Sequence, residues 1–149
     1  MNGNPEPKQS SQWIRYAEIS PDGKKIVFTF KGDLYLIDSK GGRARPLTFH
    51  QAHDFNPVWS GDSSKIAFAS DRYGNFDIFI MDIETGNPKR LTHHSNREIP
   101  YAFTPDGQHL FFGARRMDDV NHRQHPRNSM VELYKVPVAG GRVSLVLTT

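Results

Sequence analysis

The sequence contains no cysteine, which excludes a disulfide framework, an iron–sulfur site and a cysteine-ligated zinc. No apolar run approaches the roughly 18 residues of a membrane-spanning helix, so no membrane span is expected. The excess of charge of one sign is also small, because 19 Lys and Arg and 16 Asp and Glu leave a net charge of only +3. This balance does not favour nucleic acid as a partner, because binding to phosphates needs a concentrated basic surface.

A sustained apolar stripe at helical spacing is missing too, and this predicts almost no helix. The opening segment is rich in Pro, Asn, Gln and Ser and has no apolar signal core. Such a composition cannot bury enough surface to fold, so residues 1–12 are expected to form a disordered polar leader.

Internal repetition dominates the rest of the chain. The three copies span residues 13–48, 49–92 and 93–148. Equivalent aspartates, 40 and 44 residues apart, are Asp22, Asp62 and Asp106. Each copy ends in Leu-Thr, and the last copy is longer because of an insertion at residues 115–130. A period of this length indicates one supersecondary unit used three times.

Each copy contains four short segments that favour strands. A turn such as Pro-Asp-Gly at 21–23 or 105–107 separates the first two, with Gly where a positive φ is needed. Apolar runs follow, such as Ile66-Ala67-Phe68, and Gly-rich turns precede the last strand. Four antiparallel strands repeated in this way predict an all-β fold: three four-stranded antiparallel blades of an incomplete β-propeller.

A blade has two apolar faces, which it buries against the blades on either side. We therefore expect Trp59, Phe68 and Phe79 in the core. Three blades leave two faces open, one predicted around Ile19, Val27 and Phe28 and the other around Phe103 and Phe111. Either further blades of a longer chain or a second copy, forming a homo-oligomer, would cover these faces.

The strings SPDGKKIVF, FASDRYGNFDIFIMDIETGNPKRLT and FTPDGQHLFF resemble the WD-like repeat of TolB-type propellers. The stretch from Ile14 to Thr92, followed by HHSNREIPYAFTPDG and ELYKVPVAGGR, resembles the N-terminal propeller of tricorn-type serine peptidases. The resemblance covers about residues 13–148. It implies a non-catalytic propeller that gates or positions peptide for a separate C-terminal protease domain, in a periplasmic or secreted protein.

The catalytic serine region of that family has no counterpart here, and the sequence contains no G-x-S-x-G elbow. The chain alone is therefore expected not to be an enzyme, its parent being a serine peptidase that supplies the remaining C-terminal blades and the protease domain. A protein-interaction propeller of the TolB kind, with no protease attached, is the alternative. A sugar-binding propeller is a third class, for which Tyr73 and Phe76 are the candidate aromatic platforms.

Polar residues gather in the two connections between copies, which converge on one end of a propeller channel. The residues predicted to line the channel and contact a peptide or protein are His50, His53, Asp54, Asn56, His94, Arg97 and Glu98. Their spacing does not match a restrictive metal pattern such as H-E-x-x-H, so no metal and no cofactor are predicted.

Two further segments join second and third strands. Ser70 to Asp77 is interpreted as a turn in which Gly74 has a positive φ, since it lacks the length and terminal Glu of a calcium loop. The insertion is interpreted as a basic flap that contacts an acidic peptide terminus, the catalytic domain or a neighbouring subunit, or that is simply solvated. Its arginines are Arg115, Arg116, Arg123 and Arg127.

Overall fold

A computed structural model describes residues 13–93, 97–114 and 132–147. These residues form three four-stranded antiparallel sheets and no helix, which confirms the predicted all-β class of three blades. In the same described part of the chain, no helix is long and apolar enough to cross a bilayer.

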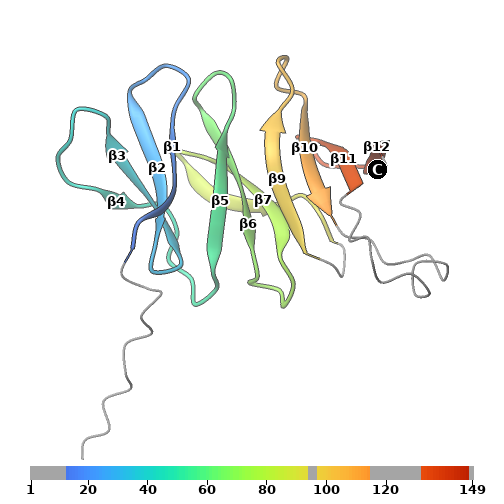
Figure 1. Cartoon of the computed structure of the whole chain (residues 1–149), viewed down its shortest axis with the longest axis horizontal. Helices are drawn as coiled ribbons and strands as arrows, with labels where there is room; N and C mark the ends of the chain where they lie inside the picture. Colours follow the sequence, from blue (N-terminus) through green and yellow to red (C-terminus); the bar gives the residue numbers. More distant parts are fainter. Residues whose placement is uncertain (1–12, 94–96, 115–131, 148–149) are drawn as a thin grey trace, which may run out of the picture.

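The three blades follow one another along the chain (Figure 1). Blade 1 contains β1 (Arg15–Ile19), β2 (Lys25–Phe30), β3 (Asp33–Asp38) and β4 (Arg45–Pro46). Blade 2 contains β5 (Asp54–Trp59), β6 (Lys65–Ser70), β7 (Asp77–Asp82) and β8 (Gly86–Arg90). Blade 3 contains β9 (Glu98–Phe103), β10 (His109–Ala114), β11 (Glu132–Pro137) and β12 (Ser144–Leu147).

The turn between the first two strands is built in the same way in every blade. In blade 1, the Ser20 hydroxyl donates to Asp22 Oδ1 at 2.6 Å and accepts the Lys25 amide at 3.0 Å. The Asp22 carboxylate also accepts the Lys24 amide at 2.9 Å. The equivalent pairs are Ser60 with Asp62 and Thr104 with Asp106. The repeated aspartates of the sequence are therefore turn residues.

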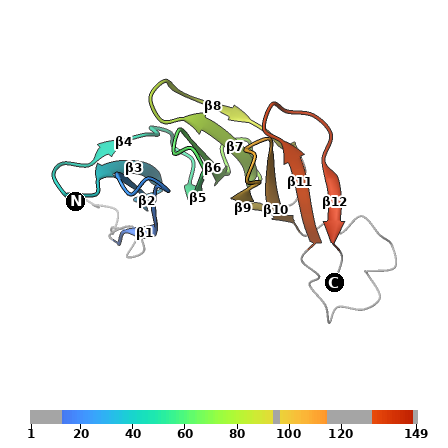
Figure 2. The ribbon, with the colours of Figure 1, turned by 90° about the horizontal axis from the view of Figure 1, so that it is seen from above.

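The blades form an arc, with β1, β5 and β9 along its concave side and β4, β8 and β12 along its convex side (Figure 2). The first strands of adjacent blades contact one another, β1 with β5 and β5 with β9. Each of these three strands is the inner edge of its sheet, and each carries a register irregularity. At the irregularities of β1 and β5, Tyr16 and Asn56 have φ of 54°.

Two apolar interfaces hold the arc together, and blade 2 contributes to both. The interface between blades 1 and 2 includes Val27, Leu34, Leu36, Ile66, Phe68, Phe79 and Met81. The interface between blades 2 and 3 includes Ala67, Ile78, Ile80, Leu91, Leu110, Phe112, Tyr134 and Val136. The predicted core residues Phe68 and Phe79 are buried, whereas Trp59 is half-buried and packs against the edge of the first interface.

The prediction of the open faces was wrong for Val27 and Phe103, and Phe28, also predicted to be open, is only 8% exposed. Val27 is fully buried against blade 2, and Phe103 packs partly against the interface of blades 2 and 3. The reason is the strand period of two, which turns neighbours such as Val27 and Phe28 toward opposite faces of the sheet. The residues that point away from blade 2 are therefore the alternate ones on β2 and β10.

Candidate functional site at the inner ends of the blades

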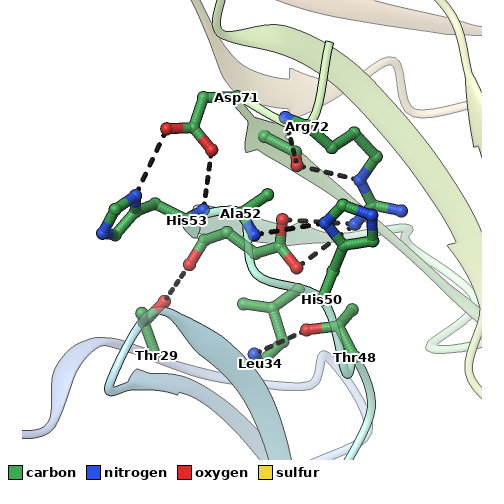
Figure 3. A network of polar contacts seen from close by, with 10 residues as sticks. Thr29, Leu34, Thr48, His50, Ala52, His53, Asp71 and Arg72 are labelled. Atoms are coloured by element: carbon green, nitrogen blue, oxygen red, sulfur yellow. Dashed lines mark hydrogen bonds and ion pairs between the residues drawn. The ribbon is translucent and has the colours of Figure 1, made fainter. Parts of the chain in front are cut away.

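The connection from blade 1 to blade 2 holds a histidine against a carboxylate (Figure 3). Asp71 Oδ1 accepts the main-chain amide of His53 at 2.7 Å, and Asp71 Oδ2 lies 3.2 Å from His53 Nδ1. The two contacts fix both the backbone and the ring of an exposed residue. Because Nδ1 is engaged, Nε2 is the ring nitrogen left for another partner.

Directly beside this pair lies a buried ion pair, also shown in Figure 3. Asp54, the first residue of β5, is fully buried, and both of its carboxylate oxygens lie 3.2 Å from a terminal guanidinium nitrogen of Arg72. Arg72 Nε donates to the Ser70 hydroxyl at 2.9 Å, and its guanidinium lies 4.5 Å from the centroid of the Phe79 ring. The ion pair thus anchors the start of the inner strand to the turn after β6.

At the next inner end, an exposed arginine rests on aromatic rings. The Arg97 guanidinium lies 5.2 Å from the ring centroids of both Phe55 and Phe76. These two rings pack edge to face at 4.6 Å, and Tyr16 of β1 lies 5.9 Å from Phe55. Residues of all three blades therefore meet here, with a cation held at the surface by cation–π contacts.

Asp33, which opens β3, lies close to the same connection. Burial raises the pKa of this carboxyl, and the nearby Asp54 raises the same pKa further, while the His50 amide and the imidazoles of His50 and His53 oppose the shift. Its Oδ1 is buried without a hydrogen-bond partner among the described residues. The connection between blades 1 and 2 therefore lies beside the Asp33 carboxylate, whose charged form is poorly solvated.

The predicted channel residues fall into three groups. His50, His53 and Arg97 are exposed and Asn56 is half-buried. Asp54 and Glu98, the first residues of β5 and β9, are fully buried and offer no side-chain surface to a ligand. His94 and the flap residues Arg115, Arg116, Arg123 and Arg127 lie outside the described residues.

Sequence reasoning did not identify Asp71 and Arg72 as partners of the connection, because it treated residues 70–77 as a self-contained turn. Gly74 does have a positive φ of 99°, as predicted, and its amide donates to the Asp71 carbonyl at 2.8 Å. The Asp71 carboxylate, however, bonds the amide of His53, 18 residues away. Neither partner could be predicted from local spacing.

In the described residues, no cluster of three or more His, Cys, Asp and Glu is arranged to hold a metal ion.

A shallow hollow of about 370 Å³ lies at the other ends of the inner strands. Its lining includes Ile19, Trp59 and Phe103, which are the last residues of β1, β5 and β9. The Trp59 indole donates to the Glu18 carbonyl at 2.9 Å and so joins blades 1 and 2. The concave side therefore has a charged and aromatic end at the strand starts and, at the strand ends, a hollow whose lining mixes apolar residues such as Ile19 with polar residues such as Glu18 and Thr104.

Three four-stranded sheets packed face to face around a common inner edge define a segment of a β-propeller. The family model of the tricorn protease N-terminal beta propeller domain matches residues 11–148. The chain belongs to this family, as the sequence resemblance indicated.

The chain is also similar in sequence to individual proteins. The uncharacterized protein Atu1656 of Agrobacterium fabrum is 30% identical over 134 residues, covering 86% of this chain and 41% of that protein. The uncharacterized peptidase YuxL of Bacillus subtilis is 30% identical over 109 residues, covering 62% of this chain and 16% of the peptidase.

Two crystal structures share the fold. TolB from Acinetobacter baumannii superposes with a TM-score of 0.71 at 26% identity, covering 90% of this chain and 32% of TolB. The tricorn protease superposes with a TM-score of 0.65 at 16% identity, covering 84% of this chain and 14% of the protease. The chain spans less than half the length of each of these four proteins.

Proposed function

We propose that this chain is a non-catalytic propeller segment that gates or positions peptide for a tricorn-like peptidase, whose catalytic domain belongs to another part of a longer protein. The observation that carries the proposal is the charged and aromatic surface at the starts of the inner strands. The blades pack through apolar faces, so the exposed cations there are not needed to hold the sheets together.

Two groups on this surface have the chemistry to hold a peptide. The Arg97 guanidinium is kept in place by Phe55 and Phe76, and it still carries N–H donors for a carboxylate. The His53 ring is oriented by Asp71, so Nε2 can bond a peptide carbonyl or amide according to the tautomer. A peptide with acidic side chains or a free carboxyl terminus suits this pair best.

The test is fluorescence anisotropy with short labelled peptides of acidic, neutral and basic composition. We expect the acidic peptide to bind best, and Arg97→Ala to weaken its binding by about 10-fold, the loss of roughly one charge-assisted hydrogen bond. Arg43→Ala is the matched control, because Arg43 is an exposed arginine in the connection between β3 and β4, away from the inner strands. Equal affinity of the wild-type chain for all three peptides would refute the proposed role of this surface.

The second candidate is a TolB-like protein-interaction propeller without a protease, which the TM-score of 0.71 with the Acinetobacter TolB favours. The two candidates differ in what the parent gene encodes beyond Thr149. Further blades followed by a catalytic serine domain would support the peptidase, whereas a coding sequence that ends when the ring is complete would support the interaction propeller.

The proposal includes a periplasmic or secreted location for the parent protein, which the tricorn-like interpretation of the sequence implied. Fractionation of cells that express the parent protein tests this location. Recovery with the periplasmic or extracellular fraction is expected, and recovery with a cytoplasmic marker would contradict it.

A further inference from the structure

The two junctions between blades differ at the end where a turn joins the first and second strands. At the junction of blades 1 and 2, the Trp59 indole donates to the Glu18 carbonyl at 2.9 Å. The Ser63 hydroxyl accepts the Asp22 amide at 3.1 Å. Two side chains of blade 2 therefore tie this end of the blade to blade 1.

Blade 3 lacks both of these side chains at the equivalent positions. Phe103, which ends β9 as Trp59 ends β5, has no N–H to donate, and Gly107 takes the place of Ser63 in the turn. Gly107 and Ser63 have similar positive φ values of 71° and 62°, so the turn keeps its shape and only the hydroxyl is lost. The Asp62 amide therefore meets no such hydroxyl in blade 3.

The space left between the turns of blades 2 and 3 is a groove of about 500 Å³, which we call the turn groove. Its walls include Gly61 and Asp62 of blade 2 and Pro105 and Asp106 of blade 3. Blades added before blade 1 or after blade 3 would extend the arc at its two ends and would not lie between these turns (Figure 2). The turn groove is thus a property of the junction between blades 2 and 3, whatever the length of the parent protein.

The turn groove adjoins the hollow at the ends of the inner strands, because Gly61, Phe103 and Pro105 line both spaces. The two volumes, about 370 and 500 Å³, fall in the range of roughly 300–1,000 Å³ that is typical of ligand pockets. An extended polypeptide can follow such a track from the concave side of the arc outward between two blades. Its backbone also supplies a carbonyl that can accept the Asp62 amide.

The charged groups along this track are mainly acidic. Glu18 lies on the hollow, and Asp62 and Asp106 lie on the turn groove. Lys65 is the one lysine or arginine among the described residues that line these two spaces. The track therefore complements a polypeptide of positive charge.

The two aspartates of the turn groove keep their charge over most of the pH range. Hydrogen bonds from hydroxyls and main-chain amides of the turns lower the pKa of Asp62 to about 2 and also lower the pKa of Asp106. The turns donate these bonds to Oδ1 of each carboxylate, which leaves Oδ2 outside the turn network. A cationic side chain can therefore bind each Oδ2 without breaking the turn.

We propose that the turn groove binds a polypeptide segment that carries a Lys or Arg side chain, with the cation at Asp62 and Asp106 and the aliphatic stem on the half-buried Phe103. This site goes beyond the proposed function. It lies at the opposite ends of the inner strands from the surface around Arg97, and it takes peptide of the opposite charge. Both carboxylates belong to exposed residues, so binding is expected to be weaker than that of an acidic peptide at Arg97.

The test is a titration of the nitrogen-15-labelled whole chain, followed by nuclear magnetic resonance. The two probes are blocked alanine pentapeptides, one with a central arginine and one with citrulline, the uncharged analogue of arginine. We expect the arginine peptide to shift the amide signals of Gly61, Asp62 and Gly107, and the citrulline peptide to bind about 3-fold more weakly or less. The signals of Gly32 and His53, at the other end of the inner strands, should not move.

Three variants test the assignment of the site. Asp106→Asn keeps an oxygen that can accept the hydrogen bonds of the turn but removes the charge, and it should weaken binding of the arginine peptide by about 3-fold. Asp22→Asn is the matched control, because Asp22 makes the same turn in blade 1 and does not line the turn groove. Gly107→Ser supplies the missing hydroxyl for the Asp62 amide and should weaken binding with no change of charge.

The comparison of the two peptides uses the wild-type chain, so it stands even if a variant fails to fold. Equal binding of the two peptides would overturn the proposal, as would unchanged binding by Asp106→Asn or Gly107→Ser, or an equal loss in Asp22→Asn. Arg97→Ala should weaken binding of the acidic peptide and leave binding of the arginine peptide unchanged. Failure of the acidic peptide to bind would therefore count against the surface around Arg97, and failure of the arginine peptide against the turn groove.

Discussion

Arg72 holds both carboxylate oxygens of Asp54 at 3.2 Å through one terminal nitrogen, and that carboxylate has no exposed surface. Removal of the arginine leaves a buried charge without its counter-ion. Arg72→Ala should therefore lower the free energy of unfolding by about 3–5 kcal/mol, measured by urea denaturation.

A double variant separates the effect of the lost ion pair from the effect of the lost packing of Arg72 on Phe79, and an exposed arginine provides the control. Adding Asp54→Asn to Arg72→Ala removes the stranded charge, so the double variant should be more stable than Arg72→Ala alone. The exposed Arg43→Ala should change stability by less than about 0.5 kcal/mol. A double variant less stable than Arg72→Ala would show that the charge is not the source of the loss.

The Leu-Thr endings of the repeats have a defined role in two blades. Thr48 Oγ1 accepts the Leu34 amide and Thr92 Oγ1 accepts the Ile78 amide, each at 2.9 Å and each buried. Thr48→Val and Thr92→Val keep the shape of the side chain but leave a buried amide unsatisfied. Each should cost about 1–3 kcal/mol of unfolding free energy.

Thr85→Val is the matched control, because Thr85 is exposed in the turn before β8. It should change unfolding by less than about 0.5 kcal/mol in the same thermal or urea measurement. Values for Thr48→Val and Thr92→Val as small as the control would mean that water replaces the hydroxyl.

Much of this fold could be predicted because equivalent residues in the three copies mark the same turns and strands. The equivalent aspartates placed the three turns, and the alternation in β2, β6 and β10 placed the blades. Which face of a strand meets a neighbour depends on packing between blades, and this is why Val27 was assigned to the wrong side.

The candidate site was less predictable for a similar reason. The propeller topology predicted that the starts of the inner strands lie close together. It did not predict the contacts from His53 to Asp71 and from Asp54 to Arg72, each of which spans 18 residues. Such partners depend on how two connections fold over one another. The burial of Asp54 and Glu98 could not be predicted either, because both are charged residues in polar segments of the sequence.

The repeated turn makes stability sensitive to acid. Hydrogen bonds from the Ser64 and Ser60 hydroxyls and the Ser64 amide lower the pKa of Asp62 from 3.8 to about 2. A carboxyl with a lowered folded pKa stabilises the fold above its unfolded pKa, and this contribution is lost as pH falls from about 4 to 2. Asp62→Asn should therefore be less stable than wild type at pH 7, by under about 1 kcal/mol because the group is exposed.

Urea denaturation of wild type and Asp62→Asn at several pH values tests this linkage. The difference between the two proteins should shrink as pH falls through the window, since the wild-type carboxylate is then protonated as well. Glu84→Gln, an exposed carboxyl of blade 2, is the control. A difference that stays constant from pH 7 to pH 2 would contradict the assignment.

Asp33 should respond to pH in the opposite direction. Burial and the nearby Asp54 raise its pKa, so the folded state favours the neutral carboxyl. The stabilisation from the neutral form is complete below the unfolded pKa of 3.8 and is lost as pH rises through the higher folded value.

Asp33→Asn keeps a similar shape and an oxygen that can accept the His50 amide, but removes the charge. The variant should therefore be more stable than wild type at pH 7, in urea denaturation, with the difference vanishing at acid pH. A less stable Asp33→Asn at pH 7 would mean that attraction between the Asp33 carboxylate and the imidazoles of His50 and His53 outweighs its burial.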